Sequence, residues 1–362
     1  MVRFETAATV AALLLVAGCG SPATAPSPDT ETARPSAPAS AGPSAADEPQ
    51  VTELLSGLTT PWGLVTLRDG RLLISERDTR RIVVVQDGQA APLRTIDDAS
   101  PAGEGGLLGL AVTADEQTVF AYFTAAEDNR IVSMSWDGTT LGEPRPILTG
   151  IPKGGRHNGG RMVLGPDGDL YVGTGETGDT DHAQDKTSLG GKILRITTEG
   201  KPAPGNPFSN EVYSYGHRNV EGLAFDAQGR LWASEFGEQT WDELNLITKG
   251  GNYGWPEVEG SGQVAGMINP KVVWSTSEAS PSGLAFWRGS LWMAALRGAR
   301  LWQIPVDGES TGTPVAHFTQ RYGRIRSVTV SADGNALLVT NSNTDGRGDP
   351  AADDDRLLEL TG

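Results

Sequence analysis

The sequence predicts an all-β protein, a six-bladed β-propeller whose blades are four-stranded antiparallel sheets. Two observations lead to this fold class. Glycine and proline, 47 and 23 of the 362 residues, make up about a fifth of the chain, and both favour turns over helices. In addition, one two-stranded pattern recurs six times after residue 51, and repeated units of about four strands are typical of propellers.

Each copy has an alternating strand, a turn such as Asp-Gly, and a second alternating strand, which together predict a β-hairpin. The six copies begin at Pro61, Gly106, Gly159, Val220, Pro281 and Ile325. A further apolar strand follows each hairpin, so that one unit spans roughly 40 to 60 residues. A β-sandwich or a pair of small β-domains is the alternative, although neither explains six similar hairpins. We expect Val51–Leu55 to pair with the last blade and close the ring.

The first twenty residues have the pattern of a bacterial signal peptide. Arg3 precedes an apolar run from Ala7 to Ala17, which is too short to span a membrane. The run leads into Gly18-Cys19, which resembles the lipobox of bacterial lipoproteins, where the cysteine is lipidated. We therefore expect residues 1–18 to be a lipoprotein signal peptide. The lipid on Cys19 would hold the protein in an extracytoplasmic position, on the outer face of the bacterial cell membrane. A plain secretory signal with an incidental cysteine is the alternative.

Residues 19–50 are rich in Pro, Ser and Ala and contain almost no large apolar side chain. Such a segment cannot bury enough surface to offset the entropy lost on ordering. It is predicted to be a disordered tether that begins at the lipidated cysteine. Residues 51–362 are predicted to form the six-bladed catalytic domain.

The charge and the cysteine count exclude several classes of function. The chain has 45 acidic and 29 basic residues and a formal net charge of −16, which disfavours a nucleic acid as partner. A single cysteine excludes an intrachain disulfide and a metal site built from cysteines. Only four histidines are available for acid–base chemistry, at positions 157, 182, 217 and 317.

Two polar clusters precede predicted hairpins and are candidates for a functional site. Residues 156–161 surround His157 with Arg, Asn and Gly, and a histidine there can titrate near neutral pH. A solvated loop histidine is the simpler alternative. Arg218 and Asn219 precede the fourth hairpin and suit a ligand rich in carboxylate or carbonyl groups. An ion pair between blades is the alternative for this second cluster.

Further charged segments lie in later repeats. Arg324 and Arg326 are two residues apart and so face one side of a strand, where an anion would relieve their repulsion, and Arg297 is another candidate cation. Residues 234–244 offer several oxygen atoms, the ligands that Ca²⁺ requires, although acidic loops are common in a chain of this charge. Residues 173–178 match G-x-G-x-x-G, but they lie in a β-repeat with no expected helix, so no dinucleotide site is predicted.

Taken in order, these segments resemble the soluble PQQ-dependent glucose/aldose sugar dehydrogenase family, six-bladed quinoproteins. The resemblance runs from about Leu58 to Leu360. The stretches that are most similar are YGHRNVEGLAF from Tyr215, KGGNYGWP from Lys249 and GGLLGLA from Gly105.

The resemblance implies two cofactors, PQQ above the central axis and Ca²⁺. It implies that His157 is the catalytic base and that Arg218 acts beside it in catalysis. It further implies cofactor contacts by Asn219, Arg297, Arg324 and Arg326, and a substrate contact by Glu104. The remaining implied residues are metal ligands: Gly237 and Glu238 for the cofactor's Ca²⁺ through their backbone carbonyls, and Asp242, Glu243 and Tyr253 for a second, structural Ca²⁺.

The implied reaction is the oxidation of an aldose at its anomeric carbon to the lactone, with electrons passed to an external acceptor such as a quinone, a dye or a cytochrome. Three positions depart from the glucose enzyme of the family: Arg297 stands for Lys, Glu238 for Pro, and Arg156 for the Asp that precedes the catalytic histidine. The alternatives are a non-catalytic carbohydrate-binding propeller lipoprotein and a Ca²⁺-dependent propeller lactonase.

Overall fold

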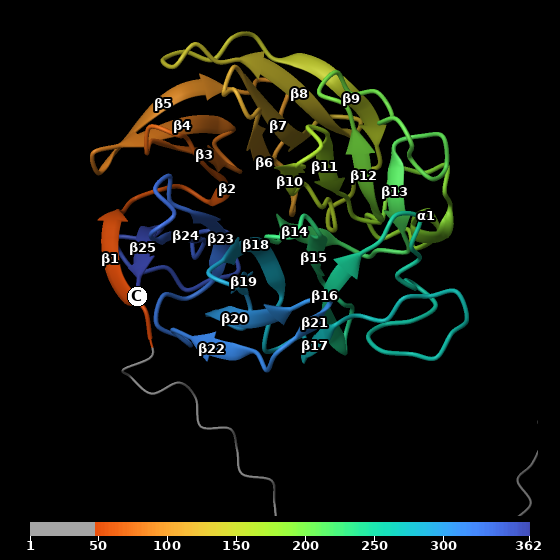
Figure 1. The fold of residues 1–362 in the computed structure, drawn as a ribbon. Helices are drawn as coiled ribbons and strands as arrows, with labels where there is room; N and C mark the ends of the chain where they lie inside the picture. Colours follow the sequence, from red (N-terminus) through yellow and green to blue (C-terminus); the bar gives the residue numbers. More distant parts are fainter. Residues whose placement is uncertain (1–47) are drawn as a thin grey trace, which may run out of the picture. The chain divides into compact units, whose positions relative to one another are not determined.

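A computed structural model of the chain describes residues 48–362. These residues form six antiparallel β-sheets, which follow one another around a ring as the blades of a propeller (Figure 1). The predicted fold class is therefore confirmed. The predicted signal peptide, Cys19 and nearly all of the predicted tether lie outside the described residues. Within residues 48–362, no helix is long and apolar enough to cross a membrane.

The first three blades each contain four consecutive strands. The first blade consists of β2 (Pro61–Thr66), β3 (Leu72–Glu76), β4 (Arg81–Gln86) and β5 (Gln89–Thr95). The second consists of β6 (Leu107–Val112), β7 (Thr118–Thr124), β8 (Asn129–Ser135) and β9 (Arg145–Ile151). The third consists of β10 (Met162–Leu164), β11 (Leu170–Gly173), β12 (Lys192–Ile196) and β13 (Val212–Tyr215). A four-residue helix, α1 (Asp181–Gln184), interrupts the connection from β11 to β12.

The last three blades complete the ring. The fourth consists of β14 (Val220–Phe225), β15 (Leu231–Glu235), β16 (Trp241–Ile247) and β17 (Val272–Ser275). The fifth consists of β18 (Pro281–Trp287), β19 (Ser290–Ala295) and β20 (Arg300–Asp307), and β20 pairs with both β21 (Ser310–Thr311) and β22 (Val315–His317). The sixth consists of β23 (Ile325–Val330), β24 (Leu337–Asn341), β25 (Leu357–Thr361) and β1 (Gln50–Leu55).

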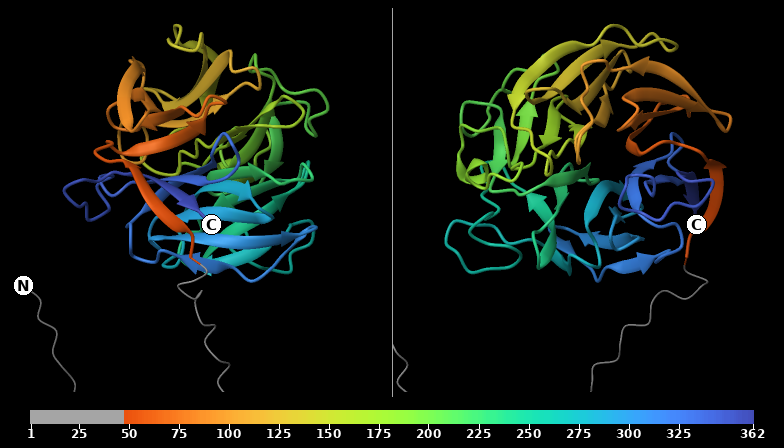
Figure 2. Two further views of the ribbon diagram at one scale, coloured as in Figure 1. Left: turned by 60° about the vertical axis from the view of Figure 1, so that its left-hand side comes forward. Right: turned by 180° about the vertical axis from the view of Figure 1, so that it is seen from behind.

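The ring is closed by the two ends of the described chain, as the sequence predicts. Strand β1 pairs antiparallel with β25, and Val51 lies opposite Leu360. The two strands lie side by side in the view of Figure 1 and in the rear view of Figure 2. The strand begins at Gln50, and Glu48 accepts a hydrogen bond from the backbone N–H of Phe318 at 3.1 Å. The domain thus starts a few residues earlier than expected.

Glycine near the start of an inner strand allows neighbouring blades to approach closely. A Cβ on Gly109 of β6 would lie 2.0 Å from the carbonyl oxygen of Gly160, just before the first strand of the next blade. A Cβ on Gly222 of β14 would lie 2.3 Å from the carbonyl oxygen of Ser282 in the fifth blade. No side chain fits such gaps, which explains why the repeats carry glycine at these positions.

Apolar side chains fill the space between blades. One buried cluster joins Trp62 of the first blade, Leu108 of the second and Leu170 of the third. Each blade therefore buries an apolar face against its neighbours, and the loops that join the strands are left to carry the polar groups.

Candidate functional site

A cavity of about 430 Å³ lies among the inner strands and their preceding loops, and every blade contributes to its wall or rim. It brings together most of the residues singled out from the sequence. Its lining comprises Trp62, Arg77, Glu104, His157, Arg218, Asn219, Glu221, Phe236, Gly237, Glu238, Asp242, Thr276, Ser280, Leu296, Arg297, Arg324, Arg326 and Arg347. Of the predicted residues, Glu243 and Tyr253 lie outside it, against a much smaller void.

His157 is held from two sides. Its backbone N–H donates to Glu104 Oε2 at 2.7 Å, and its ring Nδ1 is hydrogen-bonded to Glu176 Oε1. His157 has a φ of 53°, an uncommon conformation for a residue with a side chain. The hydrogen bond that its N–H donates to Glu104 helps to fix this conformation. A Cβ on Gly175 would lie 1.9 Å from the His157 carbonyl oxygen. Only glycine therefore allows the backbone directly before Glu176 to approach His157 this closely.

Glu176 was not singled out from the sequence, where it lies within the segment that matches G-x-G-x-x-G. It is 1% exposed. Burial acts to raise the pKa of its carboxyl group, but the hydrogen bond and charge of His157, together with a backbone N–H and the charge of Arg218, hold that pKa below its usual value. The carboxylate is therefore charged at neutral pH. It favours the tautomer in which Nδ1 carries the proton and Nε2 can accept one.

Glu104 lines the cavity, as expected for a group that contacts substrate, but both of its oxygens already have protein partners. Oε2 accepts from His157, and Oε1 accepts from Arg347 Nη1 at 2.8 Å. These bonds hold the pKa of Glu104 below its usual value despite burial. Its carboxylate supports the His157 backbone, and Arg347 reaches it from the loop between β24 and β25.

Arg218 and Asn219 project from the loop before β14. Arg218 Nη1 donates to the carbonyl oxygen of Gly237 at 2.6 Å, and its guanidinium lies 5.3 Å from the centre of the Trp255 ring. Asn219 Oδ1 accepts from the backbone N–H of Gly159 at 2.9 Å, which ties this loop to the one that carries His157. The alternative of an ion pair between blades does not describe Arg218, because its side-chain partner is a carbonyl group.

A buried network behind this loop fixes the backbone of Arg218. His217 is fully buried, and its ring nitrogens bond Glu235 Oε1 at 3.0 Å and Ser214 Oγ at 2.8 Å. Glu235 Oε2 accepts from the backbone N–H of Arg218 at 3.0 Å. The hydrogen-bonded series Ser214–His217–Glu235 resembles a hydrolytic triad. Ser214 and His217 are, however, both buried and inaccessible to a substrate. We assign them a structural role.

Arg324 and Arg326 share an anionic partner within the protein, and their expected contact with the cofactor stays a prediction. Asp345 supplies the charge, with Oδ2 at 2.9 Å from Arg324 Nη2 and 3.7 Å from Arg326 Nη2. Arg326 Nη1 also donates to Glu221 Oε2 at 2.6 Å. A carboxylate from a distant loop can neutralise two co-facing arginines, and strand periodicity cannot reveal it.

The floor of the cavity still has unsatisfied donors. Arg218 Nε and Arg326 Nε are buried without a hydrogen-bond partner among residues 48–362. The same is true of Nη2 of Arg161, a residue that does not itself line the cavity. Arg161 lies 4.3 Å from the centre of the Trp62 ring, and burial lowers its pKa to about 9. Buried unpaired donors of this kind are costly unless a ligand accepts from them.

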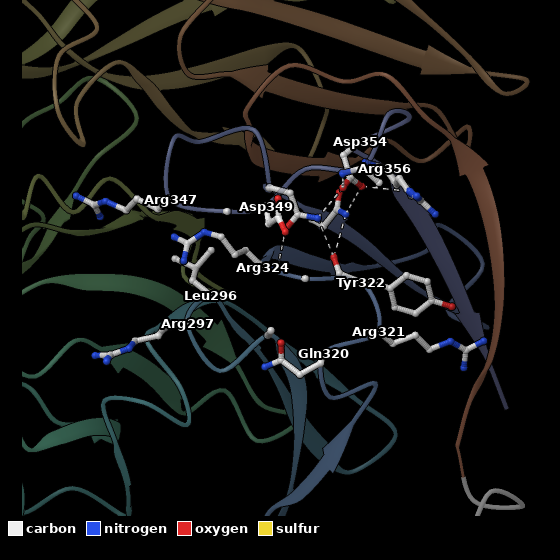
Figure 3. Close-up of a pocket in the computed structure, with 16 residues that line it drawn as sticks. Leu296, Arg297, Gln320, Arg321, Tyr322, Arg324, Arg347, Asp349, Asp354 and Arg356 are labelled. Carbon is white, nitrogen blue, oxygen red and sulfur yellow. Dashed lines mark hydrogen bonds and ion pairs between the residues drawn. The ribbon is translucent and has the colours of Figure 1, made fainter.

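Arg297 is exposed and has no hydrogen bond or ion pair with any described residue. It stands between the axial cavity and an adjoining cleft of about 480 Å³ (Figure 3). Leu296, Arg324 and Arg347 are shared by both. Arg356 at the far end of the cleft is neutralised by Asp353 and Asp354. Among the arginines that line the axial cavity, Arg297 is thus the one whose guanidinium has no described partner and is available to a ligand.

The residues expected to bind metal lie on two sides of β16. Asp242 faces the axial cavity, with its oxygens bonded to the backbone N–H groups of Gly237 and Ser280. Glu243, the next residue, points to the opposite face, where its Oε1 accepts from Gly260 N at 2.7 Å. Burial raises the pKa of Asp242 to about 6. Burial and the nearby Glu235 raise that of Glu243 to about 8.

Tyr253 lies on the Glu243 side of the strand, and its hydroxyl is already used by the backbone of Leu246 and Thr248. No group of three or more His, Cys, Asp or Glu side chains in the described part of the chain is arranged to hold a metal ion. The second, structural Ca²⁺ site stays a prediction.

The fold and the cavity define a six-bladed propeller with an arginine-lined axial site, and comparisons with known proteins identify its family. The sequence profile of the Glucose / Sorbosone dehydrogenase family matches residues 58–348, nearly the whole ring. The chain belongs to this family. Membership confirms the resemblance inferred from the sequence and removes the non-catalytic binding module as an alternative.

Three relatives illustrate the likeness. The PQQ-bound structure of aldose sugar dehydrogenase from Streptomyces coelicolor is 52% identical, covers 89% of this chain and 99% of its own, and has a TM-score of 0.84. Aldose sugar dehydrogenase YliI of Escherichia coli is 30% identical over 81% of this chain and 90% of its own length. Quinoprotein glucose dehydrogenase B of Acinetobacter calcoaceticus is 31% identical over 57% of this chain and 52% of its own length.

Proposed function

We propose that this enzyme is a PQQ- and Ca²⁺-dependent aldose sugar dehydrogenase that oxidises the anomeric carbon of its substrate to the lactone. Electrons would pass to an external acceptor, such as a quinone, a dye or a cytochrome. The observation that carries the proposal is the His157–Glu176 pair, which faces an axial cavity lined by arginines. The PQQ-bound relative at 52% identity supports the choice of cofactor.

The residues of the cavity fit PQQ, a tricarboxylate quinone. Arg218 and Arg326 each leave a buried Nε–H without a partner in residues 48–362, and Arg297 is free at the rim of the same cavity. Guanidinium groups suit planar carboxylate recognition. Arg297, Arg324, Arg326 and Asn219 would hold the cofactor, which supplies the acceptor for the hydride that leaves the anomeric carbon.

His157 would act as the general base. With the Nδ1 proton held by Glu176, Nε2 accepts the proton of the anomeric hydroxyl as the C–H bond breaks and the carbonyl of the lactone forms. Glu176 stabilises the imidazolium that results, in the same way as the acidic member of a hydrolytic triad. Arg218 places a positive charge beside the oxygen atoms of the reacting groups.

The backbone carbonyls of Gly237 and Glu238 would hold the cofactor's Ca²⁺, because hard cations prefer such oxygen ligands. A cation there would polarise an adjacent carbonyl group. Glu104 and Arg347 border the cavity as an ion pair, and Arg156 precedes the base. The substrate class that we propose is an aldose.

The location of the enzyme is also a proposal. The amino-terminal pattern supports secretion through residues 1–18, lipidation of Cys19 and a tether to residue 50, which would hold the propeller on the outer face of the cell membrane.

The test is reconstitution of the purified protein with PQQ and Ca²⁺, followed by dye reduction with a panel of aldoses. The Arg297→Ala variant should take up PQQ about 10-fold more weakly while its thermal stability is unchanged, since no ion pair is broken. Arg326→Ala is a poorer probe, because it would leave Glu221 buried and unpaired. Unchanged PQQ affinity in Arg297→Ala would remove Arg297 from the cofactor site. A protein that takes up no PQQ would overturn the proposed function.

A further inference from the structure

One carboxylate organises the whole turn that precedes β16. Glu259 Oε1 accepts hydrogen bonds from four consecutive backbone N–H groups, those of Glu238 at 2.8 Å, Gln239 at 3.0 Å, Thr240 at 2.9 Å and Trp241 at 3.0 Å. Successive N–H groups that converge in this way form an anion-binding nest, and here the protein fills it with its own side chain. Glu259 belongs to the long loop between β16 and β17.

The four bonds determine the direction of the carbonyl groups. In a trans peptide the N–H of one residue and the C=O of the preceding residue point in opposite directions. Because the N–H groups of Glu238 and Gln239 point at Glu259, the carbonyls of Gly237 and Glu238 must point away from it.

Two contacts agree with this direction. The Gly237 carbonyl accepts from Arg218, and the Gln239 carbonyl accepts from Thr276 Oγ1 at 3.4 Å. Arg218 and Thr276 both line the axial cavity. The carbonyl side of the turn therefore faces the site.

The turn has little freedom to adopt another shape. A Cβ on Gly237 would lie 1.9 Å from the Trp241 carbonyl oxygen and 2.6 Å from Glu259 Oε1. Asp242 Oδ1 holds the N–H of Gly237 at 2.9 Å. The residues of the turn are themselves exposed or half-buried, so packing contributes little and the two carboxylates set its conformation.

We propose that Glu259 is a positioning residue that aims the carbonyls of Gly237 and Glu238 into the axial cavity as ligands for a hard divalent cation. The inference rests on the proposed function, because the cation is the Ca²⁺ that would accompany the cofactor. Glu259 does not touch the cation. It orders the peptide dipoles with their negative ends toward the cavity, and its charge on the far side of the turn adds to the attraction.

The experiment compares the wild-type protein with Glu259→Ala, Glu259→Gln and the matched control Glu257→Gln. Glu257 is an exposed carboxylate two residues away that makes no hydrogen bond with a described residue. The first measurement is hydrogen exchange of the backbone amides of residues 238–241 in Ca²⁺-free protein without PQQ. The second is the CaCl₂ concentration that gives half-maximal PQQ uptake, followed by the absorbance of PQQ.

In Glu259→Ala, the four amides should exchange at least about 10-fold faster, because an unbonded amide loses its protection. The required Ca²⁺ concentration should rise by about 10-fold or more, since site rigidity tunes Ca²⁺ affinity. Glu259→Gln keeps an acceptor oxygen but loses the charge, so both effects should be smaller. Glu257→Gln should behave as wild type.

An unchanged Ca²⁺ requirement in Glu259→Ala would overturn the proposal, and so would unchanged amide exchange. Failure of the proposed function looks different. In that case even wild-type protein takes up no PQQ, or takes it up without Ca²⁺, while the exchange measurement still reports on the turn.

Discussion

His157 and Glu176 show how two residues acquire a role from their contact. Neither a histidine nor a glutamate is unusual in a loop, and either residue alone could be an ordinary polar loop residue. Their hydrogen bond, the burial of Glu176 and the position of His157 on the cavity together fix one tautomer of His157, which the proposed general base requires. Two predictions follow at the scale of the single residue.

Replacing His157 by Ala should remove the base without removing the cofactor, because the arginines remain. We expect turnover of the best aldose to fall by about 10²–10⁴-fold, the usual contribution of general base catalysis, with PQQ uptake unchanged. Steady-state dye reduction and PQQ absorbance measure the two quantities.

The control for this variant is His182→Gln, because His182 lies on α1, is partly exposed and does not line the cavity. His217 is unsuitable as a control, since it is fully buried in the network behind Arg218. Near-normal turnover in His157→Ala would contradict the proposed mechanism.

The Glu176→Gln substitution keeps the size of the side chain and removes its charge. An amide cannot stabilise the imidazolium as a carboxylate does, so kcat should fall by roughly 10- to 10²-fold. KM and PQQ affinity should change little, because the side chain of Glu176 bonds His157 and its hydrogen bond to Arg218 is made by the backbone, which the substitution keeps. A variant that changes KM alone would show that Glu176 acts in substrate binding instead.

At the scale of the element, the hairpin turns explain why short polar segments recur in the sequence. In the turn between β14 and β15, Asp226 accepts from the backbone N–H groups of Gln228 and Arg230, from Arg230 Nε at 2.7 Å and from Trp232 Nε1 at 2.9 Å. Gly229 completes the turn with a φ of 74°. One aspartate thus satisfies several donors that the hairpin exposes.

Asp226→Asn should destabilise the propeller by about 1–3 kcal/mol at neutral pH, because buried donors lose a charged acceptor. Burial acts to raise the pKa of Asp226, but the hydrogen bonds prevail and hold it below the ordinary value of 3.8. A lowered folded-state pKa contributes stability above the unfolded value, and that stability is lost as the pH falls through the folded pKa.

Urea unfolding at neutral pH and at pH values below 3.8 measures the free energy of unfolding of both proteins. The difference in this free energy between wild type and Asp226→Asn should become smaller as the pH falls into the acid range. Asp98→Asn is the control, because Asp98 is exposed and its carboxylate has no hydrogen-bond partner among the described residues. A difference in unfolding free energy that is constant over the whole pH range would show that the charge of Asp226 does not contribute to stability.

At the scale of the whole molecule, stability depends on ring closure. Strand β1 covers the edge of β25, and Leu358 and Leu360 are 2% exposed. An open edge strand is prone to pair with other chains. The amino-terminal strand is therefore a part of the sixth blade, although the rest of that blade is more than 260 residues away in the sequence.

A chain that begins at Glu48 should melt at the same temperature as the full-length chain. A chain that begins at Gly57 lacks β1 and should melt several degrees lower and self-associate, because β25 becomes an edge strand. Calorimetry and size-exclusion chromatography test both forms. If the chain that begins at Gly57 stays monomeric with an unchanged melting temperature, β1 does not close the ring in solution.

The sequence by itself determined the repeat, the hairpins, the closing strand and the loops that carry His157, Arg218 and Arg297. These features are local: alternation, turn residues and the glycine near the start of several inner strands follow from backbone geometry within a few residues. Six copies of one local pattern then leave a propeller as the simplest fold.

Only the tertiary structure decided which charged groups meet. Glu176 pairs with His157, Asp345 neutralises Arg324 and Arg326, and Glu259 turns four amides away from the cavity. Each partner comes from a different loop, and the distance between loops depends on how the blades close around the axis. Electrostatic pairing acts through space, so no spacing along the chain could reveal it.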